Sequence, residues 1–358
     1  MKIGLVSAHA FLKEGGVKNH IIFLKKYLEK EGHSVKILLP EDFGKIFFLP
    51  ANASEGTISF SSKKKIFFVL EKEKFDILHF HNFSLFFPYF VLKKAKKMKK
   101  KPVLILTFHA SLDASFFLKK SSPLIKIFEK KILPLFDGII FTSEAVASQI
   151  QTKIPSIIIP NGISLEKFSP EGEVIKKFPF KKFIFFVGRL EKRKGVFYLL
   201  KIFKLLKKDF PFLHLVIGGE GPLKRKLQKY ALRLGLKKVH FVGRISDDDL
   251  PKYYRSSLFC LFPSLFGEGF GIVLLEAMAS GTVPFGFKNK GYLEVLKEKE
   301  KYLLTEPKDT KTLVQKIKRF LLDKDLRISL ENWAKKEVKK YSWEKVVKNI
   351  LNFYKKFL

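Results

Sequence analysis

The sequence predicts an α/β protein made of two Rossmann-like, doubly wound parallel-sheet domains that face a cleft. Three observations predict it. Short apolar runs of strand length alternate with segments of helix length, the pattern of parallel sheets covered by helices. The alternation stops in a segment rich in proline and glycine, 160–180, and then starts again. The length of 358 residues exceeds one ordinary domain, and a hydrophobic content of 46% can fill two cores.

The first half opens with a strand, a helix and a second strand. Residues 1–7 are the first apolar run, 17–31 repeat apolar side chains at helical spacing until Gly32, and 34–39 are the second run. This βαβ opening indicates a parallel sheet. Further strands of the same kind are expected at 77–80, 103–108, 138–142 and 156–159, with lysine-rich helices between them.

The second half repeats the alternation. The expected strands are 183–187, 214–217, 239–242 and 258–262, and the expected helices are 196–207, 222–234, 247–255 and 272–279. The predicted domains are therefore 1–170 and 181–341, because the break between the two alternations lies in the linker. The last segment, 342–358, is amphipathic, and we expect it to form a helix that packs back on the N-terminal domain.

The chain is organised around the stretch 263–281, which reads PSLFGEGFGIVLLEAMASG. Gly267, Gly269 and Gly271 lie where a strand hands over to a helix, and glycine there lets backbone N–H groups and a helix N-terminus approach a phosphate. Glu276 interrupts an otherwise apolar helix, where a carboxylate is costly without hydrogen-bonding partners such as sugar hydroxyls. Glu268 is flanked by glycines. Two glutamates at this spacing are common on solvated helices, but these surroundings favour a binding role.

Basic residues follow the strand expected at 183–187. Arg189 can act as a forked donor and Lys194 as a point charge, and both suit a diphosphate leaving group whose charge grows in the transition state. The alternative is a solvated basic turn. The glycines at 218–222 have a similar alternative, a tight turn without ligand. A G-x-G-x-x-G fingerprint is absent both there and after the first strand, which argues against a dehydrogenase.

Histidines close several strands. His109 follows the strand expected at 103–108, where a substrate would lie, and His9, His79 and His81 are similar candidates at strand ends. A lone histidine is more often structural than catalytic. No set of histidine, cysteine and carboxylate residues has the spacing of metal ligands, so we expect no structural metal. A G-x-S-x-G nucleophile elbow is also absent.

The formal net charge of +35 is compatible with nucleic acid or an anionic membrane as a partner. A coding sequence rich in A and T would also raise lysine and phenylalanine together, and the lysines are spread over both halves. The local clusters are Lys63, Lys64 and Lys65, and the run 93–101. The single cysteine, Cys260, and the lack of a signal-peptide pattern or a span-length apolar run predict a cytoplasmic protein.

Together these motifs resemble the GT-B glycosyltransferases of family four, a retaining family that moves a sugar from a nucleotide diphosphate donor. The resemblance covers nearly the whole chain, through GGV at 15–17, EGH at 31–33, TFH at 107–109, IPNGI at 159–163, VGRLEKRKG at 187–195, GGEGP at 218–222 and the stretch 263–281. Within the family, the N-terminal half looks most like the phosphatidylinositol mannosyltransferases, because of its short spacing to GGV and the lysines ahead of FDILHFH.

The resemblance implies a role for each matching residue. Arg189 and Lys194 would bind the donor pyrophosphate, and Glu268 with the backbone of Gly269, Phe270 and Gly271 would hold the donor sugar. The ribose hydroxyls would bind Glu276, and the base would lie beside Arg244 and Ile245. His109 would lie beside the transferred sugar, and Gly16 would approach the phosphate. The donor is then a GDP- or UDP-linked sugar, with no metal or other cofactor. The leaving phosphate takes the acceptor proton, so no protein nucleophile is needed.

Some positions depart from the family pattern. The segment 289–294 keeps one glycine where the family has GG-x-x-E, which leaves the sugar identity open. Asn82 replaces an acidic residue, and His9 replaces an aromatic one, which weakens the phosphatidylinositol assignment. We expect a lipid or lipid-linked acceptor at the cytoplasmic membrane face, with Lys63, Lys64 and Lys65 facing the membrane. The alternatives are a soluble sugar acceptor, a basic nucleic-acid-binding protein and an inactive GT-B scaffold.

Overall fold

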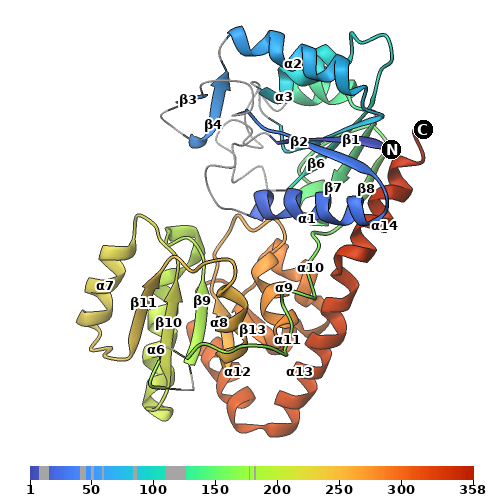
Figure 1. Cartoon of the computed structure of the whole chain (residues 1–358). Helices are drawn as coiled ribbons and strands as arrows, with labels where there is room; N and C mark the ends of the chain where they lie inside the picture. Colours follow the sequence, from blue (N-terminus) through green and yellow to red (C-terminus); the bar gives the residue numbers. More distant parts are fainter. Residues whose placement is uncertain are drawn as a thin grey trace. The chain divides into compact units, whose positions relative to one another are not determined.

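The computed structural model describes residues 1–7, 16–40, 46–49, 52–58, 60–83, 87–109, 126–176, 178–180 and 183–358. The chain divides into two compact units, 1–162 with 343–358, and 163–342 (Figure 1). Each unit contains a parallel sheet of six strands covered by helices, which confirms the predicted fold class. No helix among these residues combines the length and the apolar character that a membrane crossing needs.

The sheet of the first unit has the strand order β2-β1-β5-β6-β7-β8, and every pairing in it is parallel. Its strands are β1 (Lys2–Ser7), β2 (Ser34–Leu38), β5 (Ile77–His81), β6 (Val103–Phe108), β7 (Gly138–Phe141) and β8 (Ser156–Ile158). His79 is therefore inside β5 and not at its end, whereas His81 is the last residue of the strand. An antiparallel pair, β3 (Ile46–Leu49) with β4 (Asn52–Ile58), was not expected from the sequence.

Both faces of this sheet are buried, because alternate residues of a strand point to opposite faces. On β6, Ile105 belongs to the apolar cluster under α1 (Gly16–Lys30), while Leu104 and Leu106 belong to the cluster on the other face. The helices α2 (Phe60–Glu73) and α3 (Phe87–Ala95) supply residues to that second cluster and lie on the opposite side of the sheet from α1 (Figure 1). The remaining short elements are η3 (Phe128–Ile132), η4 (Leu133–Leu135) and α5 (Glu144–Ala147).

The C-terminal helix α14 (Trp343–Tyr354) packs in the first unit, next to α1. Its apolar residues recur every three or four positions, and Trp343, Ile350 and Tyr354 are buried in the same cluster as β1 and β5. Gly162 fits beneath this helix because a Cβ there would lie 2.5 Å from the Trp343 ring. The helix therefore completes one face of the first core.

The sheet of the second unit has the order β11-β10-β9-β12-β13-β14, again with parallel pairings throughout. Its strands are β9 (Phe183–Val187), β10 (His214–Gly218), β11 (Val239–Gly243), β12 (Phe259–Phe262), β13 (Pro284–Phe287) and β14 (Leu304–Thr305). Its helices are α6 (Val196–Asp209), α7 (Lys224–Arg233), α8 (Leu250–Ser256), α9 (Ile272–Ala279), α10 (Lys290–Leu296), α11 (Glu300–Leu303), α12 (Thr310–Leu322) and α13 (Lys324–Glu337). One apolar cluster runs through this unit.

This topology decides which loops meet. Strands β9 and β12 are neighbours in the sheet although they are far apart in the sequence, and they run in the same direction. The loops that follow Val187 and Phe262 therefore leave the sheet at the same edge. Ligands of open parallel sheets bind at this carboxyl edge.

Candidate functional site

The loop after β9 and the loop after β12 are joined by backbone contacts. The N–H of Leu265 donates to the carbonyl of Arg193 at 2.7 Å. Gly195, which ends the short 3-10 turn η5 (Lys192–Lys194), has a φ of +64°, and a Cβ at this position would lie 1.8 Å from the carbonyl oxygen of Pro263. A side chain at residue 195 would therefore push the two loops apart. Glycine here fixes how closely the basic loop approaches the glycine turn.

Lys194 and Glu268 form the ion pair at the centre of this contact. Lys194 Nζ lies 2.6 Å from Glu268 Oε1, and their side chains are only 15% and 9% exposed. The guanidinium of Arg193 is 3.6 Å from the same oxygen. Burial alone would raise the pKa of Glu268, but the charges of Lys194 and Arg193 hold that pKa below its ordinary value. The carboxylate is therefore ionised at neutral pH, and the ammonium is held in one place.

Arg189 lies on the same loop but takes a different partner. Its Nε is 3.5 Å from Glu191 Oε2, and its side chain is 70% exposed. Glu191 also accepts from Arg193 Nε at 2.6 Å. Of the predicted pyrophosphate ligands, the structure thus brings Lys194 to Glu268 and leaves Arg189 extended at the rim of the loop. A guanidinium in this position can turn toward an anion at little cost.

The glycine turn leads directly into α9. Gly271 caps this helix in a left-handed conformation with a φ of +90° and, being glycine, offers no side-chain acceptor to the first amides. Gly267 has a φ of +74°. Phe270 is buried against Tyr341, with 5.8 Å between the ring centroids. Phe270 therefore anchors the turn between Glu268 and Gly271, and the cap residue of α9 has no side chain that could occupy the first amides of the helix.

The segment 289–294, which departs from the family pattern, packs directly against this turn. Asn289 caps α10 by accepting from the N–H of Tyr292 at 2.9 Å, and the Tyr292 hydroxyl donates to Ser264 Oγ at 3.0 Å. The one glycine, Gly291, lies where a Cβ would be 2.5 Å from the carbonyl oxygen of Glu268. The segment keeps a glycine where its backbone must touch the glycine turn. Sequence reasoning missed Ser264 and Tyr292, which carry no motif of their own.

Glu276 lies one helix turn into α9 and has a partner within the protein. Its Oε2 accepts a hydrogen bond of 2.8 Å from the hydroxyl of Tyr254 on α8. Burial raises the pKa of Glu276 to about 7, and the Tyr254 hydroxyl offsets only part of this rise. The expectation that this carboxyl needs a hydrogen-bonding partner is met by Tyr254. Because the pKa of Glu276 is about 7, this carboxyl gains or loses its proton near neutral pH, and a bound ligand can shift that equilibrium.

The residues predicted to flank the base follow β11. Arg244 is exposed, and Ile245 lies against Gly218, where a Cβ would be 2.5 Å from the isoleucine side chain. Strand β10, which ends at Gly218, pairs with both β9 and β11. Arg244 and Ile245 therefore lie two strands from the basic loop, on the same carboxyl edge of the sheet.

The first unit carries the other predicted residues. Gly16 is the first residue of α1, and no atom of the described residues lies within 4 Å of a Cβ built there. Lys64 and Lys65 are exposed on α2, whereas the side chain of Lys63 lies outside the described part of the chain. Gly15 and His9 also lie outside the described residues.

His109, at the end of β6, is part of a cluster of buried imidazoles. His81 Nδ1 lies 2.9 Å from His109 Nε2, and the ring centroid of His20 on α1 is 4.4 Å from that of His109. His79 bonds to Thr107 Oγ1 and to the Tyr354 hydroxyl, each at 2.6 Å. Sequence spacing did not reveal this cluster, because its members come from α1, β5 and β6. One sequence signal for the cluster was present: His81 ends β5 and His109 directly follows β6, and these two consecutive strands are neighbours in the sheet.

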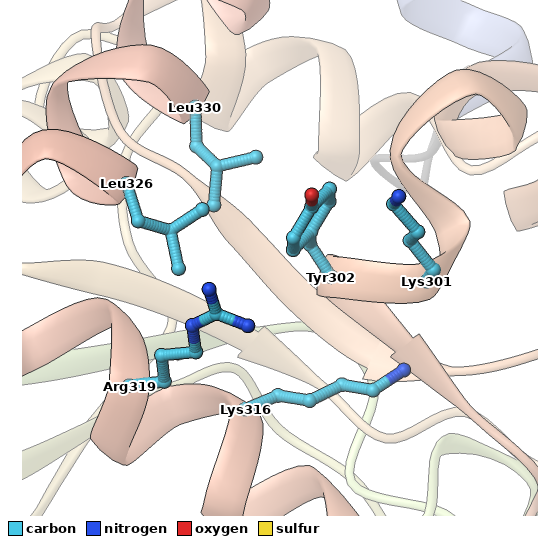
Figure 2. Close-up of a pocket in the computed structure, with 6 residues that line it drawn as sticks. All are labelled: Lys301, Tyr302, Lys316, Arg319, Leu326 and Leu330. Carbon is cyan, nitrogen blue, oxygen red and sulfur yellow. The ribbon is translucent and has the colours of Figure 1, made fainter. Parts of the chain in front are cut away.

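A cavity of about 230 Å³ in the second unit is lined by none of the predicted residues. Figure 2 shows Lys316 and Arg319 from α12, Leu326 and Leu330 from α13, and Lys301 and Tyr302 from α11 around it. Lys316 Nζ donates to the carbonyl of Leu304, and Arg319 Nε lies 3.8 Å from Asp323. Both cations thus have partners within the second unit, and none of the residues predicted for the donor site lies at this cavity.

Two family models match the chain, one in each half. Residues 14–167 match the model described as Glycosyltransferase Family 4, and residues 171–337 match the model described as Glycosyl transferases group 1. A phosphatidyl-myo-inositol mannosyltransferase of Mycolicibacterium smegmatis is 28% identical over 99% of this chain and 93% of its own length. An uncharacterized glycosyltransferase of Methanocaldococcus jannaschii is 37% identical over 49% of this chain and 45% of its own length.

Solved structures have the same fold. The sucrose-phosphate synthase of Thermosynechococcus elongatus superposes with a TM-score of 0.75 at 21% identity, covering 99% of this chain and 98% of its own. HepE of Anabaena, solved in complex with UDP and glucose, superposes with a TM-score of 0.72 at 16% identity and covers both chains fully, at 100%. At these identities the likeness concerns the arrangement of the sheets and helices.

Proposed function

The chain belongs to the family 4 glycosyltransferases, with a group 1 domain in its second half and the GT-B fold, and from this premise we propose its reaction. It transfers a hexose from a GDP- or UDP-linked sugar to a lipid or lipid-linked glycan, with retention of anomeric configuration. The observation that carries the proposal is the nearly buried Lys194–Glu268 pair in the turn that leads into α9, whose cap Gly271 offers no side-chain hydrogen bond. The pair places a fixed cation and an ionised acceptor of hydroxyl hydrogen bonds side by side.

The donor diphosphate would bind Lys194, Arg189 and the amides at the start of α9. As the bond to the sugar breaks, negative charge grows on the leaving phosphate. A cation that is already in place stabilises this charge without reorganising. Lys194 is held by Glu268 at 2.6 Å before any donor arrives, so this condition is met. The leaving phosphate takes the acceptor proton on the same face, and the chemistry then needs neither a protein nucleophile nor a metal at the diphosphate.

The sugar and the nucleoside would bind on either side of the basic loop that carries Lys194. Glu268 has accepting lone pairs beyond the one that Lys194 uses, which suits the sugar hydroxyls, together with the backbone of Gly269, Phe270 and Gly271. Glu276 would hold the ribose hydroxyls, and Arg244 with Ile245 would flank the base. The first unit would supply His109 beside the transferred sugar and Gly16 near the phosphate.

The lipid part of the proposal rests on α2 and on the relatives. Lys64 and Lys65 are exposed there, and the ring of Phe68 on the same helix is 65% exposed. A helix with lysines and an exposed aromatic ring suits the interface of an anionic membrane. The Mycolicibacterium smegmatis relative is named a phosphatidyl-myo-inositol mannosyltransferase. We propose peripheral binding at the cytoplasmic face. A soluble sugar acceptor is the alternative.

A transfer assay tests this function. The full chain is incubated with GDP-mannose, UDP-glucose or UDP-N-acetylglucosamine and with either phosphatidylinositol vesicles or a soluble saccharide, in buffer with chelator. We expect a glycolipid product whose α-anomeric linkage, read by NMR, matches the α-linked donor. A product of inverted configuration would contradict retention. Transfer only to the soluble saccharide would contradict the lipid acceptor. If none of the donors is either transferred or hydrolysed, the proposed donor class is wrong.

A further inference from the structure

Three imidazoles of the first unit converge on one buried point. His20 lies on α1, His81 ends β5, and His109 follows β6; their side chains belong to residues that are 4%, 0% and 8% exposed. One ring nitrogen from each lies within 4.8 Å of one from each of the others. Among the described residues this is the only group of three potential metal ligands that meets in this way. His20 and His81 are 61 positions apart, His81 and His109 are 28 apart, and all three belong to different segments, so no sequence motif marks the cluster.

The hydrogen bonds of the cluster separate it into two kinds of histidine. His79 is satisfied on both ring nitrogens, by Thr107 and by Tyr354. In contrast, Nε2 of His81 and both ring nitrogens of His20 are buried with no hydrogen-bond partner among the described residues. A buried polar nitrogen without a partner destabilises the folded state, because it has lost its hydrogen bonds to water. The fold therefore leaves His20 with two buried ring nitrogens that no described residue satisfies, and an ion bound in the cluster would use one of them.

Two of the three rings already have nearly the separation that a metal requires. His81 Nδ1 and His109 Nε2 are 2.9 Å apart. Two nitrogens bound at about 2.0–2.1 Å to one tetrahedral ion are about 3.3 Å apart, so a small rotation of either ring admits the ion. The centroid of the His20 ring lies 4.4 Å from that of His109 and 5.4 Å from that of His81, which brings the third ligand within reach.

The surroundings also suit metal binding. His109 Nδ1 faces Asn161 Oδ1 at 3.4 Å, and an acceptor in that place favours the tautomer that leaves Nε2 with its lone pair. The backbone N–H of His109 donates to Asn82 Oδ1 at 2.9 Å, which fixes the start of this segment.

We propose that His20, His81 and His109 bind one transition-metal ion of the zinc class in the first unit, with water as the fourth ligand. Three imidazoles and one open position are a known ligand set for Zn²⁺. This site is separate from the diphosphate chemistry, which uses the cations of the second unit. It does share His109 with the proposed donor sugar, so a bound ion and a bound donor would oppose each other.

The direct test is a Co²⁺ titration of the full chain without an affinity tag, after removal of metal by chelator. Four-coordinate Co²⁺ in a site of imidazoles and water has visible d–d absorption that is far more intense than that of aqueous Co²⁺ and lies at longer wavelength. We expect saturation at one equivalent and loss of the absorption when Zn²⁺ is added. The absence of a saturable, one-equivalent spectrum would overturn the proposal. This reading is independent of transferase activity, so it does not fail if the proposed reaction is wrong.

Variants locate the site. His20→Gln and His81→Gln should each weaken Co²⁺ binding at least about 100-fold, since even partners behind the ligands are worth about 10–100-fold in metal affinity. The matched control is His240→Gln, which breaks a histidine pair of the second unit in which His214 Nδ1 lies 2.9 Å from His240 Nε2. It should bind as the wild type does. Circular dichroism verifies folding. Equal binding in a folded His20→Gln variant, or loss in His240→Gln, would overturn the assignment.

Discussion

Lys194 Nζ and Glu268 Oε1 lie 2.6 Å apart although 74 positions separate them in the sequence. The two residues meet because they follow neighbouring parallel strands, β9 and β12, and because Gly195 lets the two loops touch. The pair is nearly buried, and the Glu268 carboxylate stays ionised because of the cations beside it. The fold thus holds one ammonium group in a fixed position before a ligand arrives, which is what stabilisation of a leaving diphosphate requires.

Replacing Lys194 should remove most of the activity. We expect Lys194→Ala to lower kcat/KM for the nucleotide sugar by about 10²–10³-fold, the usual cost of losing one prearranged group that stabilises transition-state charge. Thermal stability should fall as well, because Glu268 loses its nearest cation and keeps the more distant Arg193 and a hydrogen bond with Ser264. Steady-state kinetics with the preferred donor measure the loss. Lys192→Ala is the matched control, since Lys192 is exposed on the same short turn and should leave kcat/KM unchanged. Equal losses in both variants would contradict a specific role for Lys194.

Glu276 should make the second unit less stable at high pH. Its pKa is raised from 4.5 to about 7, so the folded state is favoured while the carboxyl is protonated, and this advantage disappears as pH rises from about 4.5 to 7. Glu276→Gln keeps an acceptor for Tyr254 without the charge. At pH 8 the free energy of unfolding of this variant should exceed that of the wild type by about 1–3 kcal/mol, and its Tm should be higher. Near pH 4 the two proteins should differ little. A variant that is less stable at pH 8 would contradict the raised pKa.

The same group should control donor affinity in the opposite sense. Ribose hydroxyls donate to an ionised carboxylate, so the proposed ribose contact strengthens as Glu276 loses its proton. We expect the Kd of the nucleoside diphosphate, measured by calorimetry, to decrease between pH 6 and pH 8 for the wild type. Glu276→Gln should bind more weakly at pH 8 and lose this pH dependence. An unchanged Kd in the variant would remove Glu276 from the ribose site.

Gly195 should be far less replaceable than another glycine of the same backbone conformation. Gly195 and Gly235 have φ angles of +64° and +70°, but a Cβ at Gly195 meets the Pro263 carbonyl at 1.8 Å, and a Cβ at Gly235 meets nothing within 4 Å. Gly235→Ala should cost only the left-handed strain, about 1–2 kcal/mol. Gly195→Ala should cost clearly more and also lower activity, because the two loops must separate. Urea unfolding of both variants tests this. Equal destabilisation would mean that the contact with Pro263 yields freely.

Helix α2 should carry the affinity for anionic membranes. Flotation with phosphatidylinositol vesicles should decrease in the double variant Lys64→Glu, Lys65→Glu, because each lysine near an anionic surface contributes about 1 kcal/mol of attraction. It should also decrease in Phe68→Ser, which removes the exposed aromatic ring from the interface. The control is Lys226→Glu with Lys229→Glu, which makes the same charge change at exposed positions of α7. If both double variants lose binding equally, then the net charge of +35 and not α2 drives the association.

The fold was largely predictable because its strands are buried on both faces. Such strands are continuous apolar runs, and those expected at 103–108 and 183–187 match β6 and β9 residue for residue. The strands that were missed have weaker patterns. Strand β13 begins with Pro284 and contains Gly286, and β14 has only two residues. These two strands form because they add to the edge of an existing sheet, and their own residues have little preference for strand structure. No local sequence pattern therefore indicates them.

The candidate site divides in the same way. The sequence predicts Lys194, Glu268 and the glycines as site residues, and the structure brings Lys194 to Glu268. Their pairing depends on strand order, which the sequence does not state. Tyr254 and Tyr292 look like ordinary aromatic residues until the fold directs their hydroxyls to Glu276 and Ser264. The histidine cluster escaped because metal-ligand spacing is a property of a single segment, whereas these rings come from three.

The central claim is that the second unit binds a nucleoside diphosphate through Lys194, and a thermal-shift titration with GDP and UDP in buffer with chelator tests it most directly. A ligand that binds only the folded state adds about 2.7 kcal/mol of stability at 100 times its Kd. We predict a Tm that rises with the concentration of one of the two nucleotides in the wild type and stays nearly flat in Lys194→Ala. No shift with either nucleotide, or an equal shift in the variant, would contradict the account.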